Sequence, residues 1–304
     1  MERYQIILAY DGADFVGSQR QTSTSLSRAA KSRTVQGELE KALRALGWDG
    51  RTVYLAGRTD SGTHASGQVA AFDLDWQHSL EDLSNALNAN LPADMAVREV
   101  KIAAAKFQPR FDATSRRYRY RLFCRSVRDP LRERYAWRVW PPVADLTPLA
   151  QIWPGTHDFA PFGSPTRPGG SSVRTVFSAE WKGQDDEWIF EIQADAFLYR
   201  MVRRLVFVQV AVGQGRVPAE TLVQALRGRP ACRASGAGRP EAPSRGFAEP
   251  ALRNEGNAHT VPLSLREPSG ASRGIPAGLA PANGLTLVEV RYDNGRRLRD
   301  HNPG

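Results

Sequence analysis

The segment LAGRTDSGTHASGQVAAF, residues 55–72, places a carboxylate, a guanidinium and an imidazole in one short stretch of the chain. Asp60 is the carboxylate, Arg58 precedes it and His64 follows it. Asp-Ser-Gly is also a common turn sequence, because Asp bonds nearby backbone N–H groups and Gly adopts positive φ. This loop follows an apolar run, however, and rigid scaffolds present catalytic groups on such loops. A carboxylate kept ionised by a nearby cation can act there as a nucleophile or a general base.

A second candidate lies in the apolar run LYRMVRRLVFVQVAVGQG, residues 198–215, which predicts a buried helix. Arg203 is placed inside that helix, where a guanidinium needs a partner. Arg204, the next residue, is better explained by a side chain that extends to the surface. The arginines that stay within this helix therefore need acceptors, and the pattern leaves those acceptors open.

The chain is basic, with a net charge of +9 and a pI of about 9.9, which favours a polyanionic partner. A coding bias towards Arg gives the same totals. The distribution is more informative, because residues 110–138 contain ten arginines and three acids. Three tyrosines lie among them: Tyr118, Tyr120 and Tyr135. Arg binds phosphates through paired hydrogen bonds and aromatic rings stack on unstacked bases, so this mixture predicts an RNA surface, although an exposed strand face looks similar.

The stretch GRTDSGTHASGQVAAF resembles the signature of the tRNA pseudouridine synthases that modify the anticodon stem-loop. The resemblance extends over most of the chain through YDGADFVGSQRQ, TVQGELEKAL, FDATSRRYRYRLF, GTHDFAPFGS, DAFLYRMVRRLV and GLTLVEVRY. It implies a cytoplasmic homodimeric isomerase that converts uridine to pseudouridine at tRNA positions 38 to 40, without a cofactor or metal. It also implies an α+β fold of two ferredoxin-like halves with antiparallel or mixed sheets and a catalytic cleft between them.

The resemblance assigns a role to each matching residue. Asp60 corresponds to the catalytic aspartate, and Arg203 to the arginine that pairs with it. Tyr118 corresponds to the tyrosine that stacks on the target uracil, and we assign Arg58 to substrate contact or base flipping. The reaction breaks the N1–C1′ bond and rejoins the uracil through C5. The sequence leaves two routes open, in which Asp60 attacks C1′ or abstracts a ribose proton.

Two residues near this motif need a separate interpretation. We expect His64 to hold the loop through a ring hydrogen bond and not to act as an acid or base. Ser18 stands where the family has Trp, which leaves the role of that position open.

Two other functions are weighed against the isomerase. One is a non-catalytic RNA-binding protein on the same scaffold, but a pure binder has no use for Asp60 facing phosphates. The other is a hydrolase that uses Asp60 with His64, and it has no metal set or nucleophile elbow in the sequence. His157 and Asp158 form a possible metal pair, but the sequence shows no third ligand.

The elements that must position these residues follow from apolar periodicity. The patterns predict strands at 4–10, 52–57, 67–74, 96–103, 115–124, 172–183, 187–197 and 284–292. They predict helices at 35–46, 80–90, 198–215 and 219–228. Thr34 and Ser79 are the expected N-caps of the first two helices. The strands and helices alternate without a regular βαβα order, which favours α+β.

We divide the chain into an N-terminal half, residues 1–105, which carries the Asp60 loop, and a C-terminal half, residues 106–304. Residues 229–280 are rich in Gly, Pro, Ala, Ser and Arg and predict a disordered insertion. Residues 21–33 predict a polar loop, and residues 294–304 a polar tail. The chain has no apolar run of membrane-spanning length and no signal-peptide pattern at its start, so we expect no membrane association.

Overall fold

The computed structural model describes residues 1–20, 33–227 and 274–293. These residues form an α+β fold around a mixed ten-stranded sheet of order β4-β1-β3-β10-β5-β9-β8-β7, with β2 beside β3 and β6 beside β5. The strands are β1 Glu2–Tyr10, β2 Tyr54–Leu55, β3 His64–Leu74, β4 Met95–Ile102, β5 Ala113–Cys124, β6 Trp137–Val139, β7 Gly155–Asp158, β8 Val173–Gln184, β9 Glu187–Ala194 and β10 Leu285–Tyr292. The helices are α1 Val35–Ala45, α2 Leu80–Asn90, α3 Pro130–Glu133, α4 Thr147–Ala150, α5 Met201–Gly213 and α6 Glu220–Arg227.

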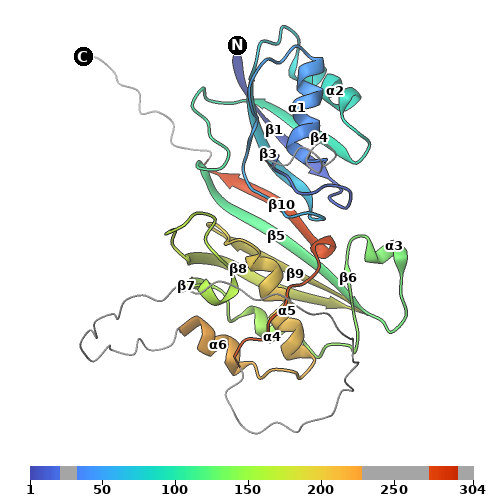
Figure 1. The fold of residues 1–304 in the computed structure, drawn as a ribbon, viewed down its shortest axis with the longest axis vertical. Helices are drawn as coiled ribbons and strands as arrows, with labels where there is room; N and C mark the ends of the chain where they lie inside the picture. The colour runs from blue at the N-terminus through green and yellow to red at the C-terminus, as the bar shows by residue number, and fades with distance from the viewer. Residues whose placement is uncertain (21–32, 228–273, 294–304) are drawn as a thin grey trace, which may run out of the picture.

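One end of the sheet consists of β4, β1, β3 and β2, and the helices α1 and α2 lie beside it (Figure 1). Alternate side chains of a strand point to opposite faces, and β1 follows this rule. Its buried residues are Tyr4, Ile6, Leu8 and Tyr10, and they share a core with Leu39 and Leu43 of α1. The apolar face of this end of the sheet is therefore covered by the helices.

The two helices begin where the sequence predicts. Thr34 Oγ1 accepts a hydrogen bond from the Gly37 N–H, which caps α1. Ser79 and Asp82 form a reciprocal capping box at the start of α2. Both helices match their predicted ranges to within one residue, because a strong cap and a regular apolar stripe define each of them.

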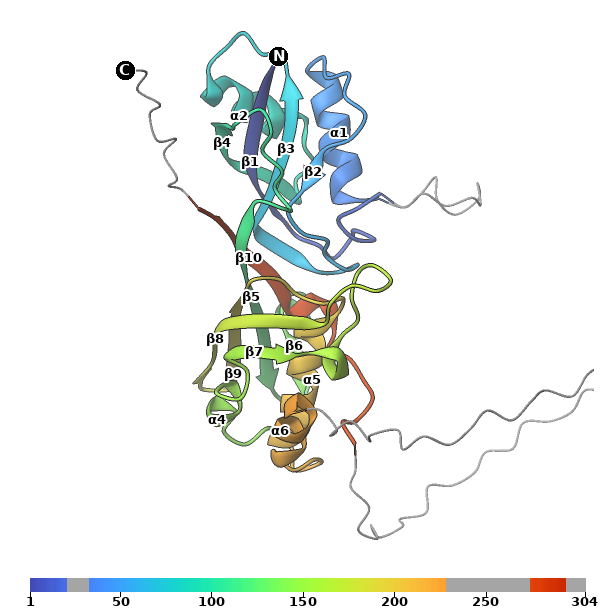
Figure 2. The same ribbon diagram turned by 90° about the vertical axis from the view of Figure 1, so that its left-hand side faces the viewer.

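Strand β10 joins the two halves of the chain into one sheet. It pairs in parallel with β3 through Thr286 and Leu287, and along its length it pairs antiparallel with β5. Figures 1 and 2 show β10 between the β1–β3–β4 end of the sheet and the β5–β9–β8 end. The helices α4, α5 and α6 lie beside the second end. The last described strand is therefore at the centre of the sheet.

Strand β5 separates its tyrosines from its arginines. The side chains on one face are buried: Tyr118, Tyr120 and Leu122. The arginines of the other face pair with glutamates of neighbouring strands, namely Arg117 with Glu289, Arg119 with Glu191 and Arg121 with Glu187. Strand alternation therefore places these tyrosines and arginines on opposite faces of β5, and the RNA surface expected of residues 110–138 stays a prediction.

The predicted insertion at 229–280 is described from residue 274 onwards. Its end is packed: Ala280 is fully buried, and its N–H donates to the carbonyl of Arg203 in α5 at 3.2 Å. The prediction of disorder is therefore wrong for residues 274–280, which pack on the fold through the Ile275 side chain and through the hydrogen bonds between Ala280 and Arg203. The rest of the insertion, the tail at 294–304 and most of the predicted loop at 21–33 lie outside the described residues.

No helix in the described ranges has the length and apolar character needed to cross a membrane.

Candidate active site

Asp60 lies in the loop of residues 57–63, between β2 and β3. It lines a cleft of about 1160 Å³. The start of this loop is fixed by Gln68, a fully buried residue of β3. Gln68 accepts a hydrogen bond from the Gly57 N–H at 3.2 Å and donates one to the Gly57 carbonyl at 2.9 Å. The loop therefore leaves the sheet in a defined direction.

The Asp60 carboxylate pairs with Arg203, which lies in the first turn of α5. Arg203 Nη1 is 2.6 Å from Asp60 Oδ2, and the two side chains are 14% and 23% exposed. Arg203 Nε donates to the carbonyl of Ala280 at 2.7 Å, which fixes the plane of the guanidinium. The structure thus brings together two predicted residues that are 143 positions apart in the chain.

The turn interpretation of Asp60 is correct for its backbone. The Thr63 N–H donates to the Asp60 carbonyl at 3.1 Å, so residues 60–63 form a turn. The Asp60 side chain takes no part in that turn, because its hydrogen bond is to Arg203. A residue that was needed for the turn alone would direct its carboxylate to the nearby backbone.

Tyr118 of β5 lines the same cleft as Asp60. Its ring is 9% exposed and stands edge-on to Phe197, with 5.0 Å between the ring centroids and 87° between the planes. Burial raises the pKa of the Tyr118 phenol well above its ordinary value, with smaller contributions from Tyr10 and the Asp60 carboxylate. The phenol therefore stays protonated at neutral pH, and the ring is held rigidly at the cleft.

The cleft carries a strong positive charge. Among the described residues that line the cleft, Asp60 is the one carboxylate, and six arginines accompany Arg203: Arg20, Arg58, Arg110, Arg116, Arg174 and Arg200. The pKa of Arg110 is lowered by burial and by the positive charges of Arg58, Arg167 and Arg116. Like charges brought together in this way favour an anionic ligand, which relieves their repulsion.

Arg116 and Arg58 have different surroundings within this group. Arg116 is largely buried, and its guanidinium donates to the carbonyls of Asp195 at 2.9 Å and Arg110 at 2.5 Å. Arg116 Nη2 also contacts the carbonyl of Ala56, just before the Asp60 loop, at 3.4 Å. Arg58 is exposed at the cleft. Arg116 therefore holds the start of the Asp60 loop through the Ala56 carbonyl. The exposed Arg58 side chain can extend towards a ligand.

His64 lies behind the loop and is not among the residues that line the cleft. The Gly12 N–H donates to His64 Nδ1 at 3.0 Å, and His64 Nε2 is 3.1 Å from the Asn283 carbonyl. Burial lowers the pKa of the His64 imidazole, and the nearby Asp11 carboxylate opposes that change. The expected structural ring hydrogen bond is therefore confirmed, and the arrangement gives no support to a hydrolase that pairs His64 with Asp60.

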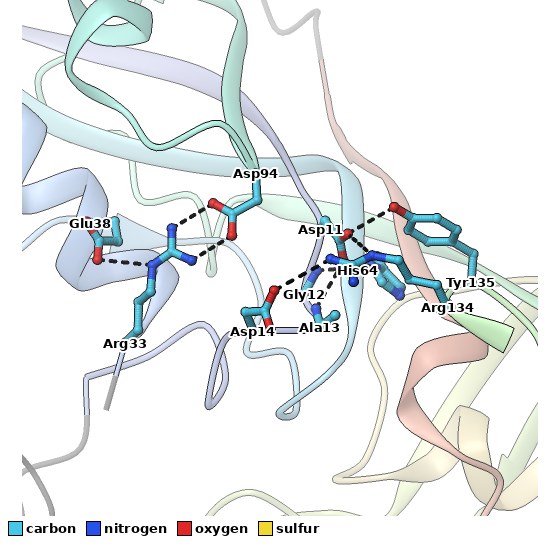
Figure 3. Close-up of polar contacts among 10 residues, drawn as sticks. All are labelled: Asp11, Gly12, Ala13, Asp14, Arg33, Glu38, His64, Asp94, Arg134 and Tyr135. Atoms are coloured by element: carbon cyan, nitrogen blue, oxygen red, sulfur yellow. Dashed lines mark hydrogen bonds and ion pairs between the residues drawn. The ribbon is translucent and has the colours of Figure 1, made fainter. Parts of the chain in front are cut away.

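Figure 3 shows that His64 belongs to a polar cluster around Asp11, at the end of β1. Asp11 Oδ2 accepts hydrogen bonds from Arg134 Nε at 2.8 Å and from the Tyr135 hydroxyl at 2.9 Å. Asp11 Oδ1 is 3.1 Å from His64 Nδ1. Arg134 and Tyr135 follow β5 in the chain, so this cluster connects the segment after β5 to the end of β1, beside the Asp60 loop.

His157 and Asp158, the possible metal pair, each contact a backbone group. His157 Nε2 is 3.1 Å from the carbonyl of Pro154, and Asp158 Oδ1 accepts a hydrogen bond from the Ala160 N–H at 3.0 Å. Within the described parts of the chain, no three His, Cys, Asp or Glu side chains are grouped closely enough to hold a metal ion.

Sequence reasoning missed two residues that support the site, Gln68 and Ala280, and it left the role of Ser18 open. Ser18 is fully buried and bonds to the backbone beside Asp60. Gln68 fixes the start of the loop and Ala280 orients Arg203. Gln68 gives a weak signal in the sequence, as an amide within an apolar strand. Ser18 is visible only as a departure from the family pattern, and Ala280 gives no signal, since its role depends on a contact between distant segments.

Comparisons with known proteins agree with the geometry. A family model described as tRNA pseudouridine synthase matches residues 9–112 and 149–246. The chain is 39% identical over 306 residues to tRNA pseudouridine synthase A of Chloroflexus aurantiacus, which covers 97% of this chain and 90% of the relative. It is 32% identical over 301 residues to tRNA pseudouridine synthase A of Limosilactobacillus fermentum, which covers 97% of both chains. The solved structure of an archaeal box H/ACA sRNP Nop10-Cbf5 complex aligns with 68% of this chain and 52% of its own, at 9% identity and a TM-score of 0.27, which is too low to support an argument.

Proposed function

Because the chain belongs to the tRNA pseudouridine synthase family, we propose that Asp60 is the catalytic carboxylate of its isomerase activity. The activity itself is that of a tRNA pseudouridine synthase, an isomerase. The observation that carries the assignment is the 2.6 Å pair of Asp60 and Arg203 inside a cleft lined by arginines. A carboxylate surrounded by arginines is suited to act on an anionic RNA.

The reaction moves one bond of the target nucleotide. The N1–C1′ bond breaks, the uracil turns, a C5–C1′ bond forms, the hydrogen on C5 leaves as a proton and N1 takes up a proton, so atoms and electrons balance without an oxidant or reductant. Asp60 either attacks C1′ or removes a ribose proton. A primary isotope effect on tRNA with deuterated ribose is expected for proton removal and not for attack on C1′.

Other residues of the cleft bind and orient the nucleotide in this proposal. The target base must leave its stack to be turned, and Tyr118 offers an aromatic face beside Asp60. Arg203 pairs with Asp60 and directs one carboxylate oxygen. Arg58, which is exposed at the cleft, contacts the substrate backbone or helps to flip the base.

We propose that the substrate uridines are those at positions 38 to 40 of the anticodon stem-loop. The experiment uses purified protein and a tRNA transcript with uridines at these positions, and maps pseudouridine by carbodiimide labelling and primer extension. Wild type is expected to give product there and Asp60→Asn none. A transcript with cytidine at the three positions is the matched control. Product from Asp60→Asn would overturn the catalytic assignment, and bound but unmodified tRNA with wild type would indicate a binding protein.

We also propose that the fold consists of two ferredoxin-like halves, 1–105 and 106–304, with the cleft between them. Strand orders support this proposal: the N-terminal half runs β4-β1-β3-β2 and the C-terminal half β10-β5-β9-β8. When the short strands β6 and β7 are left out, each half takes its strands in the order fourth, first, third, second, which is the order of a βαββαβ unit. Separate expression of residues 1–105 tests whether that half folds independently.

A homodimer in the cytoplasm completes the proposal and rests on the sequence resemblance described above. Light scattering coupled to gel filtration is expected to give twice the chain mass of 33.6 kDa, and cell fractionation to place the protein with the cytoplasmic tRNA. A monomer mass at micromolar concentration would contradict the dimer.

A further inference from the structure

Ser18 is a fully buried serine that contacts the residue before Asp60. Its Oγ accepts a hydrogen bond from the Thr59 N–H at 2.8 Å, and its own N–H donates to the Thr59 carbonyl at 3.1 Å. The Ser18 carbonyl accepts from the Gln36 N–H at 2.9 Å, in the first turn of α1. Ser18 therefore anchors both polar groups of the Thr59 backbone to a helix.

The same segment also holds the residues that follow Asp60. The Phe15 carbonyl accepts hydrogen bonds from Ser61 Oγ at 3.1 Å and from the Gly62 N–H at 3.3 Å. Gly17 permits the close approach, because its φ is +116° and a Cβ at that position would lie 3.1 Å from the Thr59 carbonyl oxygen. Residues 15–18 thus fix the backbone on both sides of the carboxylate.

We propose that Ser18 is a positioning residue, whose hydroxyl aims the Asp60 carboxylate by holding the Thr59 N–H. This inference rests on the proposed catalytic role of Asp60. Two side-chain torsions separate the Asp60 backbone from its carboxylate, so a shift of the Thr59–Asp60 peptide is passed on to the oxygen that meets Arg203. Displacements of about 1 Å in a reacting group can reduce rates about 100-fold.

The alternative is that Ser18 contributes stability alone. Loss of its hydroxyl would leave the Thr59 N–H without its acceptor at a site where Thr59 is 8% exposed, and that costs stability in either case. Stability therefore does not separate the two interpretations. The rate of the chemical step and the mobility of the loop do, because a stabilising residue elsewhere in the sheet would change neither.

The test compares Ser18→Ala and Ser18→Cys with Ser115→Ala. Cysteine keeps nearly the volume of serine but is a weak acceptor, so it tests the hydrogen bond without opening a cavity. Ser115 is a matched control, since it is 4% exposed and its Oγ also accepts a hydrogen bond, from Gln193 Nε2 at 2.9 Å. The measurements are the single-turnover rate at saturating tRNA, the Kd for tRNA, and hydrogen exchange of the peptide 57–63.

Both Ser18 variants are expected to slow the single-turnover rate at least tenfold, to leave Kd within twofold and to speed exchange in the peptide 57–63. Ser115→Ala is expected to keep the wild-type rate and loop exchange. Ser18 variants with the wild-type rate, or with unchanged loop exchange, would overturn the proposal. If wild type makes no pseudouridine, the proposed function fails, whereas the exchange measurement still decides whether Ser18 holds the loop.

Discussion

Arg203→Lys separates two contacts that one guanidinium makes together. In the wild type, Arg203 reaches Asp60 Oδ2 at 2.6 Å through Nη1 and the Ala280 carbonyl at 2.7 Å through Nε. A lysine keeps the charge, but its ammonium is a single point on a flexible stem and lacks the planar fork that spans both acceptors. We therefore expect the variant to bind tRNA normally and to hold Asp60 in the wrong orientation.

The magnitude follows from the geometry. Both side chains are less than a quarter exposed, so solvent screens the pair weakly. A hydrogen bond to a charged group contributes about 1.5–3 kcal/mol. If that contribution is lost from the transition state, the rate of the chemical step falls about 10- to 150-fold, at 1.36 kcal/mol per factor of ten.

The assay is a single-turnover reaction with tRNA that carries tritium on C5 of uridine, because C5 loses its hydrogen when the C5–C1′ bond forms. The Kd for tRNA is measured in parallel. Arg204→Lys is the matched control: this residue follows Arg203 in α5 and donates to the Gly278 carbonyl at 2.8 Å, away from Asp60. A rate for Arg203→Lys within twofold of wild type would contradict the role of Arg203 in orienting Asp60. A loss of tRNA affinity without a loss of rate would contradict it as well.

Three further predictions test other parts of the site. Gly278→Ala is expected to lower the unfolding free energy by about 1–3 kcal/mol in denaturant titration, because the new Cβ would lie 2.2 Å from the Phe207 ring and φ is +141°. Below pH 6.5, wild type is expected to lose stability as pH falls, because burial lowers the pKa of His64 in the folded chain. The unfolded chain then takes up a proton that the folded chain does not. The Tm of His64→Gln, measured against pH, should fall less steeply than that of wild type. Tyr118→Leu is expected to lose about 1–3 kcal/mol of base stacking and to lower kcat/KM by the corresponding factor. An unchanged kcat/KM would argue against stacking on this ring.

The elements that sequence reasoning predicted well are those specified by local interactions. The caps Thr34 and Ser79 act on backbone N–H groups three residues away, so the starts of α1 and α2 are visible in the sequence. The strand predicted at 115–124 ends where β5 ends and begins within two residues of its start. Short elements such as α3, α4, β6 and β7 were missed, because tertiary pairing stabilises them and their own periodicity is too short to detect.

The site was predictable where burial of a charged side chain without a hydrogen-bond partner would cost free energy. A guanidinium within the apolar run of α5 requires an acceptor, and the family resemblance indicated that the acceptor of Arg203 is Asp60. Ser18 is visible only as a departure from the family pattern and Ala280 not at all, since a small residue in a loop is compatible with many surroundings. Their contributions are backbone contacts between segments that are distant in the chain, and residue type carries little information about such contacts.

The central position of β10 has a consequence for synthesis on the ribosome. Residues 285–292 are translated after every other described strand, yet they fill the gap between β3 and β5. Until they emerge, the nascent chain presents two unpaired strand edges, which are prone to pair with other chains. A chain interrupted before residue 285 would keep both edges open, and it would lack the Ala280 and Asn283 carbonyls wherever the interruption precedes them. Incomplete products are thus expected to be both inactive and prone to aggregate, and quality control can recognise them by these exposed edges.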